Sequence, residues 1–168
     1  MSGTVSRHFP YEVTSSLMFF TQRTVVFSKI VHVPVSKARC VLEDPKMLIN
    51  LSPLVEECEE SKSGEATTYV VTDIMKVWGI YWPVKYTCTF KKEEDALLCE
   101  VNAGRTVRTL SAWRVKAVND GKESEVSEEV KAEVFTLLMP YVLGQIKSSH
   151  LVLLDRLAAK LELGGREN

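Results

Sequence analysis

The sequence lacks the motifs of metal and nucleotide chemistry. Its 168 residues contain no glycine-rich phosphate loop, no Ser-His-Asp ordering and no His-Glu-x-x-His pair. The four cysteines form neither a Cys-x-x-Cys pair nor the dense framework of small secreted proteins, which favours free thiols in a reducing compartment. We therefore expect no metal, no cofactor and a cytoplasmic location.

Excess charge and long hydrophobic runs are also missing. The formal net charge is −1, and acidic clusters at 56–57, 59–60 and 93–95 would repel phosphate backbones. Near the N-terminus, the apolar run at 17–20 is far shorter than a signal-peptide core or a membrane span. These features predict no nucleic-acid partner and no stable membrane insertion.

The composition present is that of a globular protein. Hydrophobic residues make up 45% and charged residues 26%, and the length suits one domain with a sizeable core. We expect an N-terminal arm or extra edge segment at 1–23, a folded ligand-binding domain at 24–163 and a flexible tail at 164–168.

Alternating apolar and polar residues predict a sheet of seven strands. A β-branched run at 24–33 is the first strand. Short helices at 37–42 and 46–51 follow, with Ser36 as the expected N-cap of the first and Pro45 at the start of the second. The other strands are predicted at 54–61, 67–75, 81–91, 96–103, 106–118 and 123–135. Asp120-Gly121 is a strong hairpin signal, so an antiparallel meander is the simplest topology.

A long amphipathic helix at about 137–161 closes the sequence. Apolar residues recur at steps of three and four along one helix face and include a single imidazole: Leu143, Ile146, His150, Leu153, Leu157 and Leu161. The predicted fold is α+β, a curved seven-stranded antiparallel sheet wrapped on this helix. The two short helices would plug one end and leave an internal apolar cavity.

This order of elements resembles the START-like, or helix-grip (SRPBCC), superfamily. The resemblance rests on VHVPVS at 31–36, LEDPK at 42–46, LSPLV at 51–55 and AWRV at 112–115. Within the superfamily the chain is similar to the polyketide cyclase branch, including fungal cyclases that close an α-pyrone on a polyene chain. The superfamily has no invariant catalytic set, so the resemblance assigns no catalytic residue.

The resemblance implies a hydrophobic, polyketide-like small molecule as ligand and a polyketide synthase as partner. The segment at 11–23 lies outside the usual pattern of the superfamily. We expect it either to cap the pocket or to mediate a homodimer.

Three polar residues on apolar faces are candidate catalytic groups. His150 would point from the helix toward the sheet as a general base, or be a hydrogen-bonded core histidine. Glu128 alternates with valines in the last strand, so it is either a buried carboxylate or turned outward by a bulge. Asp73, between Val71 and Met75, is either in the site or at its rim.

Aromatic residues supply candidate walls for the substrate, with phenol groups able to donate a hydrogen bond to a carbonyl or enolate oxygen. The alternative is that they belong to the core: Tyr69, Tyr81, Trp82, Tyr86 and Trp113. Arg108 alternates toward solvent, and would bind a carboxylate or carrier phosphate only if sheet curvature brings it to the pocket mouth.

Two functions remain open from the sequence. The first is a cofactor-independent polyketide cyclase that folds a reactive poly-β-keto chain and promotes enolisation and ring closure, including lactonisation to a pyrone. In it, His150 or Glu128 removes the enol proton while Tyr86 or Tyr81 steadies the oxyanion. The second is a carrier for a sterol, fatty acid or quinone. An interaction or stress protein with a small filled cavity is a third, weaker alternative.

Overall fold

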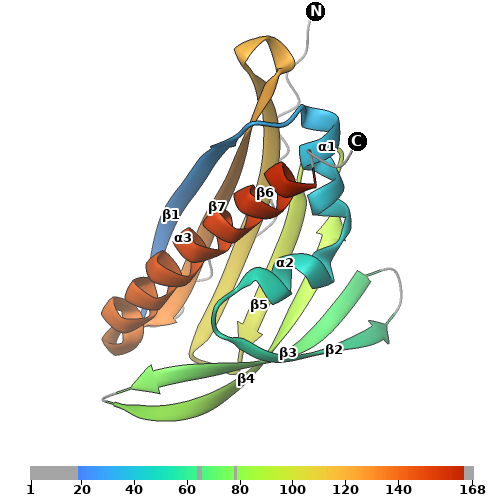
Figure 1. Ribbon diagram of the computed structural model, residues 1–168. Coiled ribbons are helices and arrows are strands. Elements are labelled where there is room, and N and C mark those ends of the chain that lie inside the picture. The colour runs from blue at the N-terminus through green and yellow to red at the C-terminus, as the bar shows by residue number, and fades with distance from the viewer. Residues whose placement is uncertain (1–18, 64–65, 78, 165–168) are drawn as a thin grey trace, which may run out of the picture.

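One sheet and one long helix form the molecule. The computed structural model describes residues 19–63, 66–77 and 79–164 (Figure 1). The strands are β1 (Phe20–Val31), β2 (Val55–Ser63), β3 (Ala66–Val77), β4 (Ile80–Lys92), β5 (Leu97–Ala103), β6 (Val107–Val118) and β7 (Glu123–Phe135). All neighbouring strands are antiparallel, in the order β1-β7-β6-β5-β4-β3-β2. The predicted meander is confirmed, and the first strand pairs with the last.

Short helices connect β1 to β2: α1 (Val35–Arg39), the 3-10 turn η1 (Cys40–Glu43) and α2 (Pro45–Leu51). Asp44 caps α2, because its side chain accepts a hydrogen bond from the backbone N–H of Met47 at 3.0 Å. The expected cap at Ser36 is wrong: Pro34 precedes α1 and makes no side-chain cap. Pro34 occupies the N-cap position instead, with its backbone in an extended conformation.

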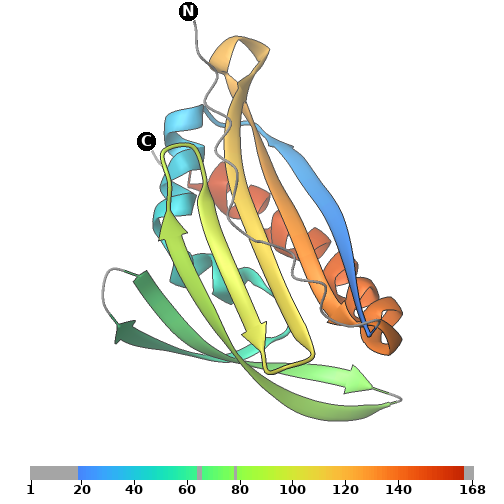
Figure 2. The ribbon, with the colours of Figure 1, turned by 180° about the vertical axis from the view of Figure 1, so that it is seen from behind.

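The long helix α3 (Met139–Leu163) follows the turns η2 (Asn119–Gly121) and η3 (Thr136–Leu138) and runs across the concave face of the sheet (Figures 1 and 2). It packs mainly on β1, with further contacts to β7 and α2. Its inner side chains are buried, with Leu157 at 1% exposure. Val126, Val130 and Val134 meet it from alternate positions of β7 and are also buried.

By length and composition alone, Thr136–Leu163 could cross a membrane. The core helix of a soluble domain passes the same test. Here Asp155 of α3 forms an ion pair with Lys29 of β1. The helix also buries four of its leucines, namely Leu153, Leu154, Leu157 and Leu161.

The fold class predicted from the sequence is confirmed, with an earlier start. β1 begins at Phe20 rather than at Thr24, so 19–23 belong to the folded part. The rest of the predicted arm, residues 1–18, and the tail beyond Gly164 lie outside the described residues. The internal apolar cavity stays a prediction.

Candidate functional site

A polar contact of a buried carboxylate joins α3 to the sheet. The Nδ1 atom of His150 lies 2.5 Å from the Oε2 atom of Glu128. Glu128 is 1% exposed, and the His150 side chain is 22% exposed. The imidazole also stacks on Phe27, with ring centroids 5.4 Å apart. A buried carboxylate needs such a partner, because an unpaired charge in the core is costly.

This pair lies beneath α3 and over the β1–β7 side of the sheet. Glu128 is opposite Phe27 of β1 and Trp113 of β6 in an unbroken register. The bulge considered for Glu128 is therefore absent from this part of β7. The carboxylate of Glu128 and the ring of Phe27 together hold the imidazole in place.

A second buried polar pair joins β3 and β4. The Tyr86 hydroxyl donates a hydrogen bond to the Asp73 carboxyl group, and Asp73 is 8% exposed. Burial raises the pKa of Asp73, and the bond from Tyr86 partly offsets this. Burial also raises the pKa of Tyr86 well above its usual range, so the phenol stays a donor.

One atom of this second pair has no protein partner. The Oδ1 atom of Asp73 is buried and makes no hydrogen bond. Buried polar atoms in native proteins nearly always have partners, so an exception calls for an explanation. The Tyr141 hydroxyl near the start of α3 is likewise buried without a partner, and nothing in the sequence pattern marked it.

The structure does not bring the three predicted catalytic residues together. Thr87, the residue after Tyr86 in β4, pairs with Asn102 of β5. Asn102 pairs with Arg108 of β6, and Arg108 pairs with Glu133 of β7. Glu128 lies five residues before Glu133 in β7, which is roughly 16 Å at the usual rise per residue. Asp73 is also four strands away from β7 in the sheet order. The two polar pairs are separate places in the fold.

The predicted wall residues divide between the two faces of the sheet. Tyr69 and Trp113 are buried in the core at 4% and 3% exposure. Trp82 shares the face of Tyr86 by alternation but is 55% exposed near the β3–β4 turn. Tyr81 and Arg108 are exposed and lie on the opposite, convex face. We therefore leave Tyr81 and Arg108 out of the site proposed below.

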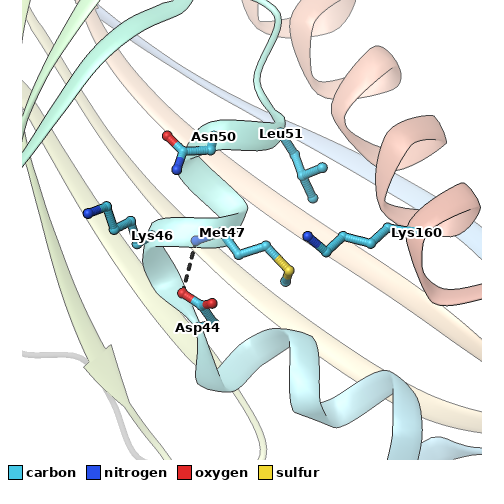
Figure 3. A pocket seen from close by; sticks show the side chains of 6 residues that line it. All are labelled: Asp44, Lys46, Met47, Asn50, Leu51 and Lys160. Carbon is cyan, nitrogen blue, oxygen red and sulfur yellow. Dashed lines mark hydrogen bonds between the residues drawn. The ribbon is translucent and has the colours of Figure 1, made fainter. Parts of the chain in front are cut away.

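A surface pocket of about 320 Å³ opens between α2 and the end of α3 (Figure 3). It is lined by Asp44, Lys46, Met47, Asn50, Leu51 and Lys160. Asp44 is engaged there in capping α2. None of the predicted site residues lines this pocket, so it gives them no support. Across the described residues, no group of three or more His, Cys, Asp or Glu could hold a metal ion.

Solved structures define the class of fold. The chain is similar to the ZhuI aromatase/cyclase of Streptomyces sp. R1128, with a TM-score of 0.73, 13% identity, and 88% of this chain and 98% of that chain covered. Norcoclaurine synthase from Thalictrum flavum gives a TM-score of 0.65 at 14% identity, with 85% and 95% covered. A START superfamily protein from Mycobacterium smegmatis gives 0.64 at 10% identity, with 83% and 97% covered. The fold is therefore the START-like helix grip.

The family is given by the sequence itself. Residues 20–163 match a family model described as "Domain of unknown function (DUF7053)", and the chain belongs to that family. No curated protein matches the sequence.

Proposed function

We propose that this protein binds a hydrophobic, polyketide-like small molecule between α3 and the concave face of the sheet, and acts on it as a cofactor-independent cyclase. The observation that carries the proposal is the buried Oδ1 atom of Asp73, which no protein group satisfies. Burying a polar atom without a partner costs about 1–3 kcal/mol. A ligand that hydrogen-bonds there, or gives up a proton there, would repay that cost.

Asp73 suits the work of a general base. Its raised pKa makes the carboxylate more basic than an exposed aspartate. Tyr86 hydrogen-bonds to the carboxyl group and, because burial raises its pKa, remains protonated. The buried Oδ1 atom of Asp73 is left for a ligand.

The proposed reaction needs no redox partner. Asp73 takes a proton from the carbon between two carbonyls of a poly-β-keto thioester, which leaves an enolate. The enolate oxygen then attacks the thioester carbonyl, a carbon–oxygen bond forms, and the carbon–sulfur bond breaks. The thiolate recovers the proton from Asp73, so the products are an α-pyrone and a free thiol. Holding the chain folded supplies much of the rate, and one placed base adds about 10²–10⁴-fold.

The surroundings of Asp73 support an apolar substrate. Asp73 pairs with Val55 of β2 and with Val84 of β4, and the buried Val71 lies two residues before it on the same face of β3. The similarity to an aromatase/cyclase supports a cyclase as one use of this fold, while fold alone does not determine chemistry. The four cysteines are free, which supports a cytoplasmic location. A polyketide synthase as partner and a homodimer remain part of the proposal.

A carrier for a sterol, fatty acid or quinone is the second candidate. It is favoured by the placement of His150, which is engaged by Glu128 and Phe27 rather than facing Asp73. In a carrier, Asp73 would only anchor a ligand head group. The predicted base roles of His150 and Glu128 stay predictions.

Turnover of a long-chain poly-β-keto thioester, followed by mass spectrometry, tests the proposal. The wild type is compared with Asp73→Asn, Tyr86→Phe and a no-protein control, and Asp120→Asn in the exposed β6–β7 turn is the matched carboxylate control. We expect cyclisation that falls about 10²–10⁴-fold in Asp73→Asn and is unchanged in Asp120→Asn.

Each other outcome redirects the assignment. Stoichiometric binding without a new product would establish the carrier. Cyclisation that survives Asp73→Asn but is lost in Glu128→Gln, with folding intact, would move the base to the His150–Glu128 pair. A protein that shows no binding and no turnover would refute both candidates.

A further inference from the structure

Antiparallel strands gather alternate turns of the chain at one end of the sheet. The start of β1, the β3–β4 turn, the β5–β6 turn and the start of α3 all lie at the lower end of the molecule in Figures 1 and 2. We call these four segments the hairpin end. The β4–β5 turn, the β6–β7 turn and the end of α3 lie at the opposite end.

Exposed apolar side chains concentrate at the hairpin end. In the described residues, seven of the twelve exposed large hydrophobic side chains belong to it: Phe19, Phe20, Ile80, Tyr81, Trp82, Leu137 and Leu138. Leu137 is 81% exposed and Tyr81 65%. Single exposed apolar residues are ordinary, but a collection at one end marks an interaction surface.

The same end is free of acidic residues in sequence. No Asp or Glu occurs in the stretches 19–27, 74–87, 101–109 and 134–147. Exposed basic residues occur in these stretches instead, and Arg23, Lys76 and Arg105 are the ones nearest the turns. Along β3, the nearest carboxylate is the buried Asp73.

The opposite end carries charges of both signs. Its β4–β5 turn contains Glu93, Glu94 and Asp95, all exposed, and its β6–β7 turn contains Asp120. Lysines accompany these acids: Lys91 pairs with Glu93, Lys92 pairs with Glu43, and Lys122 follows the turn of Asp120. The hairpin end instead offers basic residues in stretches that contain no acid, and a negatively charged surface attracts such a region.

We propose that the hairpin end docks on an anionic lipid bilayer surface. Trp and Tyr rings favour the boundary between lipid and water, where one part of the side chain is apolar and the other wet. Lys76 lies with its ammonium 5.4 Å from the ring centroid of Tyr81, so charge and aromatic surface are presented together. A second copy of the chain is the less favoured occupant, because two basic ends repel each other.

The docking also has a geometric consequence for the ligand. Asp73 lies four residues before the end of β3, close to the β3–β4 turn. A hydrophobic molecule leaving the bilayer at this end would reach the Asp73–Tyr86 pair without crossing the length of the protein. The docking does not depend on whether that pair is catalytic.

Vesicle co-sedimentation tests the proposal with phosphatidylcholine vesicles that contain or lack phosphatidylserine. A basic residue near an anionic surface contributes about fivefold in binding, so Lys76→Gln with Arg105→Gln is expected to weaken binding roughly 25-fold. Trp82→Ala is expected to weaken it as well. Lys122→Gln and Leu151→Ser are the matched controls, because both residues are exposed away from the hairpin end and should leave binding unchanged.

A second readout identifies the residue that enters the lipid. Brominated lipid should quench the fluorescence of the wild type more than that of Trp82→Phe. The proposal is overturned if the wild type does not bind phosphatidylserine vesicles, if pure phosphatidylcholine binds equally well, or if the controls weaken binding as much as the hairpin-end variants. A dimer in sedimentation that Trp82→Ala dissociates would overturn it in favour of self-association.

Discussion

Removing the imidazole of His150 should destabilise the fold severely. Glu128 is 1% exposed, and His150 supplies its charge-assisted contact at 2.5 Å. In His150→Ala the carboxylate stays buried without that partner, which costs about 3–5 kcal/mol. The lost stacking on Phe27 adds about 0.5–1.5 kcal/mol. The sum is a large fraction of the ordinary stability of a domain, about 5–15 kcal/mol.

Urea unfolding followed by tryptophan fluorescence measures this loss, since Trp113 lies opposite Glu128 in the sheet. Glu128→Gln is the matched variant, because it keeps the shape and a hydrogen bond while removing the charge; we expect a cost of about 1–2 kcal/mol. Replacing both residues by leucine should be close to neutral, because apolar groups of similar size replace a buried ion pair at little cost.

A loss below about 1 kcal/mol in His150→Ala would refute the reasoning. It would mean that water or another group satisfies Glu128 without the helix. The double leucine variant then distinguishes a site without water from one in which water satisfies Glu128. Only the site without water should tolerate the two leucines.

Two further predictions follow from other buried groups. Burial raises the folded-state pKa of Asp73 above its ordinary 3.8, so above that pH the folded state binds more protons than the unfolded state and the stability of the wild type falls as pH rises. In urea titrations, Asp73→Asn should therefore gain stability relative to the wild type as pH rises above about 4, and a difference that stays constant with pH would contradict this. Alkylation of the thiols, followed by mass spectrometry, should modify the exposed Cys40 first. The hydrogen bond with Cys88 and burial both raise the pKa of Cys99, so Cys99 should react only after unfolding. Equal alkylation rates for the two cysteines would contradict this prediction.

The spacing of apolar residues in the sequence correctly predicted which face of a strand or helix a residue occupies. A period of two placed Glu128 on the inner face of β7, and a period of 3.6 placed His150 on the sheet-facing side of α3. Their contact then follows from the packing of one face on the other. The period does not show whether the contact is catalytic or structural, because both uses need the same two faces to meet.

The Asp73–Tyr86 pair could not be derived in this way. Alternation places both residues on one face, but their contact depends on the register of the β3–β4 hairpin, which pairs Asp73 with Val84 and Val71 with Tyr86. A shift of one residue in that turn would change every neighbour. For the same reason, the distance between this pair and Glu128 emerged only from the strand register across the sheet.

The partnership of β1 with β7 bears on how the protein folds. Phe27 finds its strand partner Glu128 about a hundred residues later in the chain, so sheet closure belongs to the slow, non-local contacts that limit folding rates. During synthesis on a ribosome, β1 emerges before its partner strand β7. The edge of β1 therefore has no hydrogen-bonding partner until nearly the whole domain has been made. Its alternate exposed positions include Val26 and Ile30, which makes the nascent chain prone to mispairing. Because His150 of α3 is the partner of the buried Glu128, truncation before α3 should leave an aggregation-prone sheet.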